Sequence, residues 1–338
     1  MTENQPSVKD IILKRREQQS TPGARSDRYR VALVVEGGGM RGVVSAGMVS
    51  ALENLNLRDS FDVVYGCSAG AISGAYFVAG QSRYGTTIFY ENINNDQFIN
   101  FKRAFFGRPV LSLEYLLDHV CKHLKILDVD KIIDGDIPLK IIATSVTDGQ
   151  GTLLDRFANE IELFDSMRAS ARIPVVAGPP VKVRNKLCLD GALTEAVPYH
   201  SALRDGCTHV LALLTRPQGV YRKKPGVVDS VLFAPMLSRY GSALVNTYMS
   251  RDVTYLNEIK ELYAMVGDGK ENAVGVVQLS DKNLVVSSLE KSRARLVKGA
   301  AEGFKAVYRF FCDADPEVVE LLSVYDRTGK FAPPLTRS

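Results

Sequence analysis

The sequence lacks tryptophan, contains only four histidines among its 338 residues, and carries a net charge of just +4. So small a positive charge does not indicate a nucleic-acid-binding protein, and we expect no nucleic-acid partner. The cysteines contain no CxxC pair, which argues against a disulfide framework or a zinc site and favours reduced thiols in a cytoplasmic protein. They are Cys67, Cys121, Cys188, Cys207 and Cys312. The scarcity of histidine limits the choice of a catalytic base.

The sequence also lacks a segment suited to secretion or to spanning a membrane. The first 30 residues are polar and charged, without the apolar stretch of a signal peptide. Residues 63–82 are uncharged and just long enough to cross a bilayer, but they include four glycines and four small hydroxyl or thiol side chains. We therefore interpret them as a strand, a tight turn and a buried helix of a soluble protein.

Apolar runs of strand length alternate with helical patterns along the chain. This alternation predicts an α/β protein with a layered sheet and helices. Strands are predicted at residues 29–35, 61–65, 139–146, 208–215 and 275–279, a hairpin at 181–189, and helices at 43–55, 69–78, 161–170 and 289–311. Before the last helix, Ser287 and Glu290 form a capping-box signature.

The sequence pattern divides the chain into three parts. We expect a flexible, polar and basic N-terminal arm over residues 1–29, a core over 30–215, and a mainly helical C-terminal extension over 216–338 that packs on the core. The basic cluster Lys14–Arg16 and the basic face of the helix at 289–311 are interpreted as solvated surfaces. Contact with an anionic lipid surface is the alternative for both.

A GxSxG motif, Gly66-Cys67-Ser68-Ala69-Gly70, stands between the strand predicted at 61–65 and the helix predicted at 69–78. Gly66 and Gly70 permit the sharp turn of a nucleophile elbow, which presents Ser68 near the positive end of the helix. The simpler interpretation is a helix N-terminus of small residues packed on a sheet.

A glycine-rich loop, Gly37-Gly38-Gly39-Met40-Arg41-Gly42, follows the first predicted strand and Glu36. It also fits the GxGxxG pattern of dinucleotide-binding proteins. However, the acidic residues that could hold a ribose, Asp59 and Asp62, lie before or at the start of the next strand and not at its end. We favour an oxyanion hole, because the amides of a glycine run can converge on a developing negative charge. Arg41 would add positive potential and hold the loop.

The third motif is Asp190-Gly191-Ala192, at the end of the predicted hairpin. An Asp-Gly pair by itself indicates only a turn, but together with the other two motifs it makes Asp190 a candidate base. The three motifs, taken in this order, resemble those of the patatin-like phospholipases. The segment Ala169–Pro174 also resembles the Ser/Ala-rich helix end of that family, and the resemblance covers about residues 30–215.

Membership of that family would imply a three-layer α/β/α fold with a mainly parallel central sheet, a catalytic core over residues 30–215 and a C-terminal helical extension. It implies no cofactor and no metal. His119 and His123, one helical turn apart and close to Lys122 and Lys125, are expected on an exposed helix face and not at a metal site.

The resemblance also implies a Ser–Asp dyad. Ser68 would attack an ester carbonyl while Asp190 takes its proton, and the amides of Gly38 and Gly39, with Met40 as a further candidate, would hold the oxyanion. Asp190 would then activate the water that hydrolyses the acyl-enzyme. Because a carboxylate with a pKa near 4 is a weak base, we expect burial to raise the pKa of Asp190.

Histidine offers an alternative base. Ser68, Asp190 and either His200 or His209 occur in the chain order of an α/β-hydrolase triad. His209, however, begins a predicted strand, at the end opposite to where catalytic side chains gather, and His200 lies on an apparent helix. The Ser–Asp dyad is therefore the preferred arrangement.

The sequence thus predicts a serine hydrolase of lipid acyl esters, of the phospholipase or lysophospholipase kind, that takes a lipid or fatty-acyl ester as its substrate. Three alternatives remain: a lipid-binding protein of the same fold without turnover, an enzyme that transfers the acyl chain to an alcohol other than water, and a Ser–Asp–His esterase. We expect a cytoplasmic protein, with peripheral contact to an anionic membrane surface as the alternative that its basic surfaces leave open.

Overall fold

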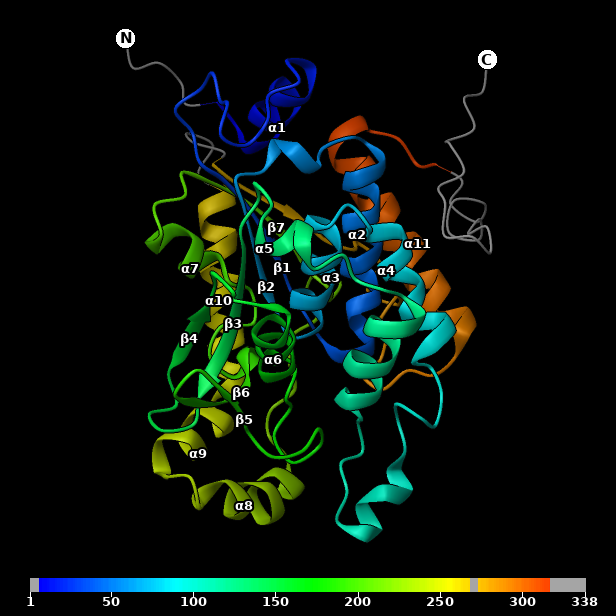
Figure 1. Cartoon of the computed structure of the whole chain (residues 1–338), viewed down its shortest axis with the longest axis vertical. Helices are drawn as coiled ribbons and strands as arrows, with labels where there is room; N and C mark the ends of the chain where they lie inside the picture. The colour runs from blue at the N-terminus through cyan, green and yellow to red at the C-terminus, as the bar shows by residue number, and fades with distance from the viewer. Residues whose placement is uncertain (1–5, 268–272, 317–338) are drawn as a thin grey trace.

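The strands of the computed structural model form one central sheet. The model describes residues 6–267 and 273–316, and the strands within them are β1 (Val31–Val35), β2 (Val63–Cys67), β3 (Leu139–Ser145), β4 (Gly151–Leu154), β5 (Val181–Val183), β6 (Lys186–Asp190), β7 (His209–Leu213) and β8 (Val274–Val277). Over these described residues the sheet has eight strands in the order β5-β6-β3-β2-β1-β7-β8, with β4 paired to β3 (Figure 1).

The centre of the sheet is parallel. β1 pairs in parallel with β2 and β7, β2 with β3, and β7 with β8, whereas β4 and the β5–β6 hairpin are antiparallel. Every residue of β1 and β2 is buried, as expected for strands covered on both faces. The mainly parallel sheet predicted from the sequence is therefore confirmed.

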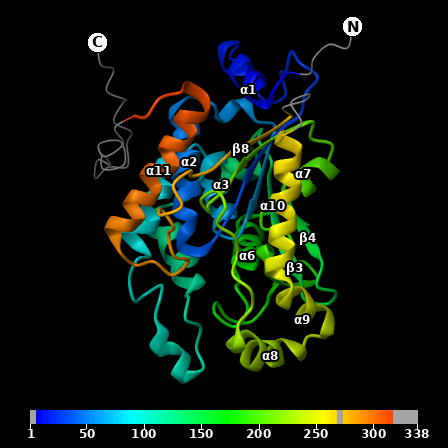
Figure 2. The same ribbon diagram turned by 180° about the vertical axis from the view of Figure 1, so that it is seen from behind.

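Helices cover both faces of the sheet, as Figures 1 and 2 show from opposite sides. The α-helices among the described residues are α1 (Val8–Glu17), α2 (Val43–Asn54), α3 (Ala69–Val78), α4 (Ser82–Thr87), α5 (Asp130–Ile133), α6 (Glu160–Ser170), α7 (Tyr199–Arg204), α8 (Ala234–Ser238), α9 (Ser242–Met249), α10 (Arg251–Gly267) and α11 (Arg293–Cys312). One face carries α2, α3, α6 and α11, and the other carries α7 and α10. This is the expected three-layer α/β/α arrangement.

The C-terminal helix α11 packs closely on α2. A Cβ at Gly303 would lie 2.1 Å from the carbonyl oxygen of Val44, and a Cβ at Gly47 would lie 2.0 Å from the carbonyl oxygen of Ala300. The buried apolar side chains of α11 include Leu296, Ala300, Phe304, Val307 and Phe311.

The predicted start of this last helix is wrong. The N-cap of α11 is Ser292, which accepts the N–H of Arg295, so the helix begins after the predicted capping box at Ser287. Glu290 instead accepts the N–H of Ser292 in the preceding turn.

The N-terminal segment differs from the flexible arm that the sequence predicted. Over residues 8–17 it forms α1, whose apolar side chains Val8, Ile11 and Ile12 are buried. Arg15, expected on a solvated surface, is only 1% exposed and binds the carboxylates of Asp27 and Asp62 at 2.8 Å. Residues 1–5 of the predicted arm and 317–338 of the predicted extension lie outside the described residues.

Within the part of the chain that the structure describes, no helix combines the length and the hydropathy needed to cross a bilayer. The uncharged run at 63–82 forms β2, a turn, α3 and the start of α4 instead, as expected.

Candidate active site

Ser68 occupies the turn between β2 and α3, where it is the N-cap of the helix. Its φ of 55° and ψ of −128° form a conformation that is rare for a residue with a side chain. A Cβ at Gly66 would lie 2.5 Å from the Cα of Ala71, and one at Gly70 would lie 2.2 Å from the carbonyl oxygen of Val35. The backbone therefore approaches itself too closely for any residue but glycine at both positions. This is the geometry of a nucleophile elbow.

Ser170, the last residue of α6, holds this turn in place. Its hydroxyl accepts the N–H of Ser68 at 2.8 Å and donates to the carbonyl oxygen of Ile142 on β3 at 2.5 Å. No motif in the sequence assigns a function to Ser170, although it belongs to the segment Ala169–Pro174 that resembles the helix end of the family.

Asp190 is the last residue of β6, and its carboxylate faces Ser68. Ser68 Oγ donates a hydrogen bond to Asp190 Oδ2 at 2.8 Å, and the N–H of Ala192 donates to Oδ1 at 2.8 Å. A Cβ at Gly191 would lie 2.2 Å from the carbonyl oxygen of Ile142, so the turn after Asp190 also requires glycine.

The environment of Asp190 suits a base. Both Ser68 and Asp190 are only 4% exposed. Burial raises the pKa of Asp190 to about 6, although the hydrogen bonds from Ala192 and Ser68 and the charge of Arg222 oppose this shift. The direction is the one expected from the sequence, and it leaves the carboxylate ionised at neutral pH.

The glycine-rich loop lies directly beside the elbow. A Cβ at Gly37 would lie 2.8 Å from the Cβ of Ser68. Gly38 and Gly39 have φ values of 147° and 60°, which favour glycine. Among the hydrogen bonds between described backbone groups, neither the Gly38 nor the Gly39 amide has an acceptor. These two N–H groups are available to an oxygen atom of a ligand.

Met40 and Gly42 serve the loop in a different way. The N–H of Met40 donates to the carbonyl oxygen of Ser288 at 3.0 Å, so it is engaged within the protein. Gly42 allows close packing, because a Cβ there would lie 2.6 Å from the Cβ of Ala69. The structure therefore brings Gly37, Gly38 and Gly39 to Ser68, while Met40 and Gly42 anchor the loop.

Thr215 fixes the shape of the loop from the end of β7. Its N–H donates to Glu36 at 2.5 Å, and its hydroxyl donates to the carbonyl oxygen of Gly37 at 2.9 Å. The hydroxyl also accepts Arg41 Nε at 3.2 Å. Arg41 is buried, and burial together with the charge of Arg216 lowers its pKa to about 10. Arg41 thus holds the loop, as expected.

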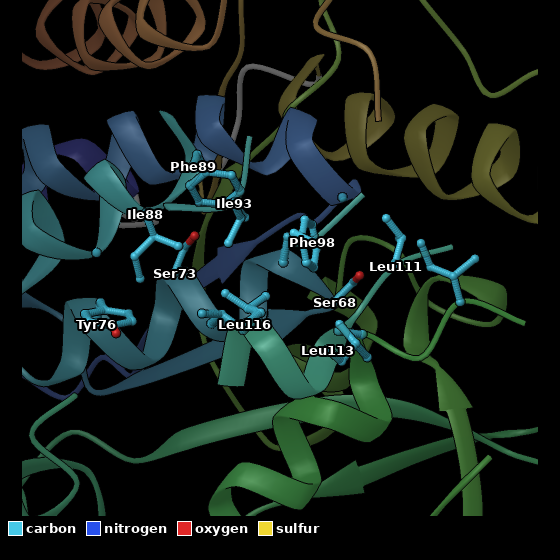
Figure 3. Close-up of a pocket in the computed structure, with 16 residues that line it drawn as sticks. Ser68, Ser73, Tyr76, Ile88, Phe89, Ile93, Phe98, Leu111, Leu113 and Leu116 are labelled. Carbon is cyan, nitrogen blue, oxygen red and sulfur yellow. The ribbon is translucent and has the colours of Figure 1, made fainter. Parts of the chain in front are cut away.

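Two pockets meet at Ser68. The first, drawn in Figure 3, is an apolar pocket with an empty volume of about 540 Å³ that runs along α3 between aromatic and aliphatic side chains. Its lining includes Ile72, Tyr76, Ile88, Phe89, Ile93, Phe98, Leu111, Leu113 and Leu116. Tyr76 lies eight residues beyond Ser68, which places it about 12 Å further along the helix axis.

The second pocket has an empty volume of about 1030 Å³ and is called the polar pocket, because charged side chains such as Arg216, Arg222 and Asp190 are part of its lining. It shares Gly39, Ser68 and Ile173 with the apolar pocket. Asp190 lines the polar pocket and not the apolar one. Arg216 and Arg222 line it from the loop 216–226. The sequence shows that this loop contains four basic residues, but it does not predict that the loop lies beside Ser68.

The histidines lie elsewhere. His209 begins β7 at the edge of the sheet opposite to Ser68, where its ring bonds to Thr208 and to the carbonyl oxygen of Pro6. His200 on α7 bonds to Glu261 at 2.9 Å. His119 and His123 lie on the π-helical segment Tyr115–Leu124, with their ring centroids 6.2 Å apart and their planes inclined at 54°. Among the described residues, no group of three or more potential metal ligands occurs.

Two further candidates from the sequence are engaged in packing. Asp62, considered as a ribose ligand, accepts the N–H of Val31 at 2.7 Å at the start of β1. Cys67 is completely buried next to the elbow, and burial raises the pKa of its thiol well above the usual value. Cys67 therefore packs as a neutral thiol.

The sequence of the chain was also compared with known protein families. The sequence model of the patatin-like phospholipase family matches residues 33–203, which is about half of the chain. The chain belongs to the patatin-like phospholipase family. The matched region contains Ser68, Asp190 and the glycine-rich loop.

Relatives with curated sequences match over a similar extent. An uncharacterized protein of Escherichia coli, YjjU, is 26% identical over 57% of this chain and 54% of its own length. A probable lipid hydrolase of Invertebrate iridescent virus 6 is 25% identical over 52% of this chain and 64% of its own length. An uncharacterized NTE family protein of Mycobacterium tuberculosis is 28% identical over 51% of this chain and 45% of its own length. The chain thus spans about half the length of these relatives.

Among solved structures, VipD from Legionella pneumophila aligns over 82% of this chain and 66% of its own, with 11% identity and a TM-score of 0.39. The type III effector ExoU aligns over 82% of this chain and 53% of its own, with 10% identity and a TM-score of 0.31.

Proposed function

We propose that this patatin-like protein is a lipid acyl-ester hydrolase in which Ser68 is the nucleophile and Asp190 is its base. One observation carries the proposal: the 2.8 Å hydrogen bond from Ser68 Oγ to Asp190 Oδ2, at the mouth of an apolar pocket. A serine hydroxyl becomes a good nucleophile only when a neighbouring base takes its proton.

In the first half of the reaction, Ser68 Oγ attacks the ester carbonyl carbon while its proton passes to Asp190. The carbonyl oxygen becomes an oxyanion that accepts hydrogen bonds from the Gly38 and Gly39 amides, for which the described residues provide no backbone acceptor. The intermediate then breaks the bond to the alcohol, which takes the proton from Asp190 and leaves an acyl group on Ser68.

In the second half, a water molecule replaces the alcohol. Asp190, ionised again, takes a proton from this water as it attacks the acyl carbon, and the returning proton restores the Ser68 hydroxyl as the fatty acid leaves. The apolar lining of the pocket along α3 suits an acyl chain, which accounts for a lipid ester as the substrate.

The test is labelling with an alkyl fluorophosphonate followed by mass spectrometry of the intact protein. We expect one adduct on wild-type protein, which Ser68→Ala abolishes and the exposed-serine control Ser280→Ala keeps. Release of fatty acid from a lysophospholipid should follow the same pattern. An unlabelled wild-type protein that still binds the lipid would instead indicate a binding protein without turnover.

We further propose that the protein meets a lipid surface with two exposed apolar tips. The first tip comprises residues 101–108 and contains the 3₁₀ helix Phe101–Phe106, in which Phe105 is 88% and Phe106 80% exposed. The second tip is the segment 227–239, with exposed Val227, Val228, Val231, Leu232 and Met236. Both tips project from the same end of the molecule, away from α1 (Figures 1 and 2). A groove lined by both tips also contains Pro174 and Phe233, which line the polar pocket as well.

The charges around these tips make them better candidates for contact with anionic lipid than the basic surface of the C-terminal helix considered from the sequence. Lys102 and Arg108 flank the exposed phenylalanines, and neither forms an ion pair with a described carboxylate. On α11, by contrast, Arg309 pairs with Asp315 and Lys305 with Glu302, which weakens the attraction of that face to anionic lipid. Aromatic side chains beside basic ones suit the interface of an anionic membrane.

Co-sedimentation with vesicles of phosphatidylcholine and phosphatidylglycerol in a 4:1 ratio tests this surface. The double variant Phe105→Ser/Phe106→Ser should weaken partitioning at least about tenfold, since each buried aromatic side chain contributes 1.5–3 kcal/mol. Lys298→Gln, an exposed site on α11, is the control and should bind like wild type. Loss of binding in the α11 variant alone would contradict the proposed surface.

A further inference from the structure

Four arginines line the polar pocket beside Ser68: Arg41, Arg216, Arg222 and Arg251. Three acidic residues line it too, but each has a defined role. Glu36 accepts the N–H of Thr215, Asp190 accepts the Ser68 hydroxyl, and Asp229 forms an ion pair with Arg251 at 2.7 Å. The remaining positive charge is concentrated on Arg216 and Arg222, which form no ion pair with any described carboxylate.

Both of these guanidinium groups retain unused hydrogen-bond donors. Arg222 donates one hydrogen bond, from Nη1 to the carbonyl oxygen of Ala192 at 2.7 Å. Arg216 lies over the ring of Tyr255, 5.2 Å from its centroid, and its Nε is buried without a hydrogen-bond partner. An unpaired buried donor on a cation costs free energy, which an anionic ligand would recover.

The positive charges of these neighbouring arginines also repel one another. Burial lowers the pKa of Arg222, and the charges of Arg251 and Arg216 lower it further. The pKa of Arg41 falls to about 10 through burial and the charge of Arg216. An anion placed among these groups would offset their mutual repulsion, and a planar guanidinium matches the oxygen atoms of phosphate in two-point contacts.

The position of Asp190 determines which part of an ester enters this pocket. The leaving alcohol must receive its proton from Asp190, and Asp190 lines the polar pocket but not the apolar one. The alcohol part of the substrate therefore lies on the arginine side of Ser68, while the acyl chain lies in the apolar pocket along α3.

We propose that Arg216 and Arg222 bind a phosphate group carried on the alcohol side of the scissile ester. The preferred substrates are then acylglycerol phosphates, and neutral acylglycerols are poor substrates. This inference rests on the proposed hydrolase function, which supplies the direction in which the ester lies.

The experiment compares two soluble substrates with the same acyl chain, an acylglycerol 3-phosphate and the monoacylglycerol, both below their critical micelle concentrations. For Arg216→Gln and Arg222→Gln we expect the ratio of kcat/KM between phosphorylated and neutral substrate to fall at least about tenfold, as lost charge-assisted hydrogen bonds predict. Arg222→Lys should restore part of the ratio.

Lys224→Gln is the matched control. It removes one positive charge from the same loop at an exposed position that does not line the pocket, so the ratio should match wild type. Equal losses on both substrates, or an unchanged ratio in the arginine variants, would overturn the proposal.

Inorganic phosphate separates a substrate phosphate from a free anion. We expect it to inhibit turnover of the neutral ester competitively, and more weakly in Arg216→Gln. Inhibition by phosphate without any preference for the phosphorylated ester would show a free-anion site and would overturn the alcohol-side assignment.

Failure of the hydrolase function itself has a different signature, which is the absence of both a Ser68 fluorophosphonate adduct and turnover of either substrate. In that case, calorimetric binding of the acylglycerol phosphate to wild type and Arg216→Gln still tests the pocket. Equal affinities would overturn the phosphate assignment.

Discussion

The two pockets that meet at Ser68 differ in how much of their lining comes from the region that matches the family. Every residue lining the apolar pocket lies between Gly39 and Ile173, inside the region that matches the patatin-like family. The polar pocket takes its arginines other than Arg41, and Tyr255 and Ser288, from residues beyond that region. The matched region thus contains Ser68, the glycine-rich loop and the whole lining of the apolar pocket. It also supplies part of the lining of the polar pocket, including Asp190, to which the segment that follows adds Arg216, Arg222 and Arg251.

The largest loss of activity is expected from a change at Asp190, the proposed base for esters of every kind. Asp190→Asn keeps the size of the side chain but removes the base, so kcat should fall by about 10²–10⁴-fold. Because the base acts on every ester, neutral and phosphorylated substrates should lose activity equally. Steady-state kinetics on the two acylglycerol substrates, with thermal melting as the folding control, measures this. A loss confined to one substrate would assign Asp190 to binding and not to proton transfer.

A change at the far end of the apolar pocket should alter only the acyl side. Ile88 lies with Tyr76 at the end of the pocket away from Ser68 (Figure 3). Ile88→Trp shortens the pocket, and the ratio of kcat/KM for long over short acyl chains should fall about tenfold, since each misfitted methylene costs 1–3 kcal/mol.

The control for this change is Ile126→Trp, at a residue that is exposed and outside the apolar pocket. It should leave the dependence on chain length as in wild type. If Ile88→Trp altered the preference for phosphate and not the preference for chain length, the assignment of the two pockets would be reversed.

The fold around Ser68 could be predicted because its signals are local. Helix α3 has the bounds 69–78 that were predicted, and the apolar runs at β1, β2 and β3 identify buried parallel strands. The N-terminal segment shows where prediction from local signals fails. Arg15 is part of a basic cluster in the sequence, but its partners Asp27 and Asp62 are 12 and 47 residues away, and only tertiary contacts bury the three together.

The candidate site likewise has residues that the local sequence predicts and residues that only the tertiary structure brings in. Ser68, Asp190 and the glycine loop are embedded in short motifs whose backbone geometry requires glycine, so the motifs show in the sequence. Ser170 contributes one hydroxyl through long-range hydrogen bonds, and Arg216 and Arg222 belong to the loop 216–226. Nothing in the local sequence of that loop indicates that it turns toward Ser68.

A smaller effect is expected on the pH dependence of turnover, because Arg222 in the polar pocket influences the pKa of Asp190. Asp190 must be ionised to accept a proton, so kcat/KM on a neutral ester should rise with pH through its pKa of about 6 and then level off. The positive charge of Arg222 favours the carboxylate, so Arg222→Gln should raise the pKa of Asp190 further and move this acid limb to higher pH. Lys224→Gln should not move it. A limb that shifts to lower pH would contradict the assignment of Asp190 as the base.

The smallest effect is expected at the histidines. His200 is partly exposed on α7 and hydrogen-bonded to Glu261, and His209 lies at the opposite end of the parallel strands; neither lines a pocket at Ser68. His200→Ala and His209→Gln, which keeps a polar side chain at the buried site, should each change kcat by less than about twofold, well below the loss from removing a general base. A loss of 100-fold or more in either variant, with melting temperature unchanged, would replace the dyad by a triad. Asp190 would then orient a histidine, and the acid limb near pH 6 would belong to that histidine.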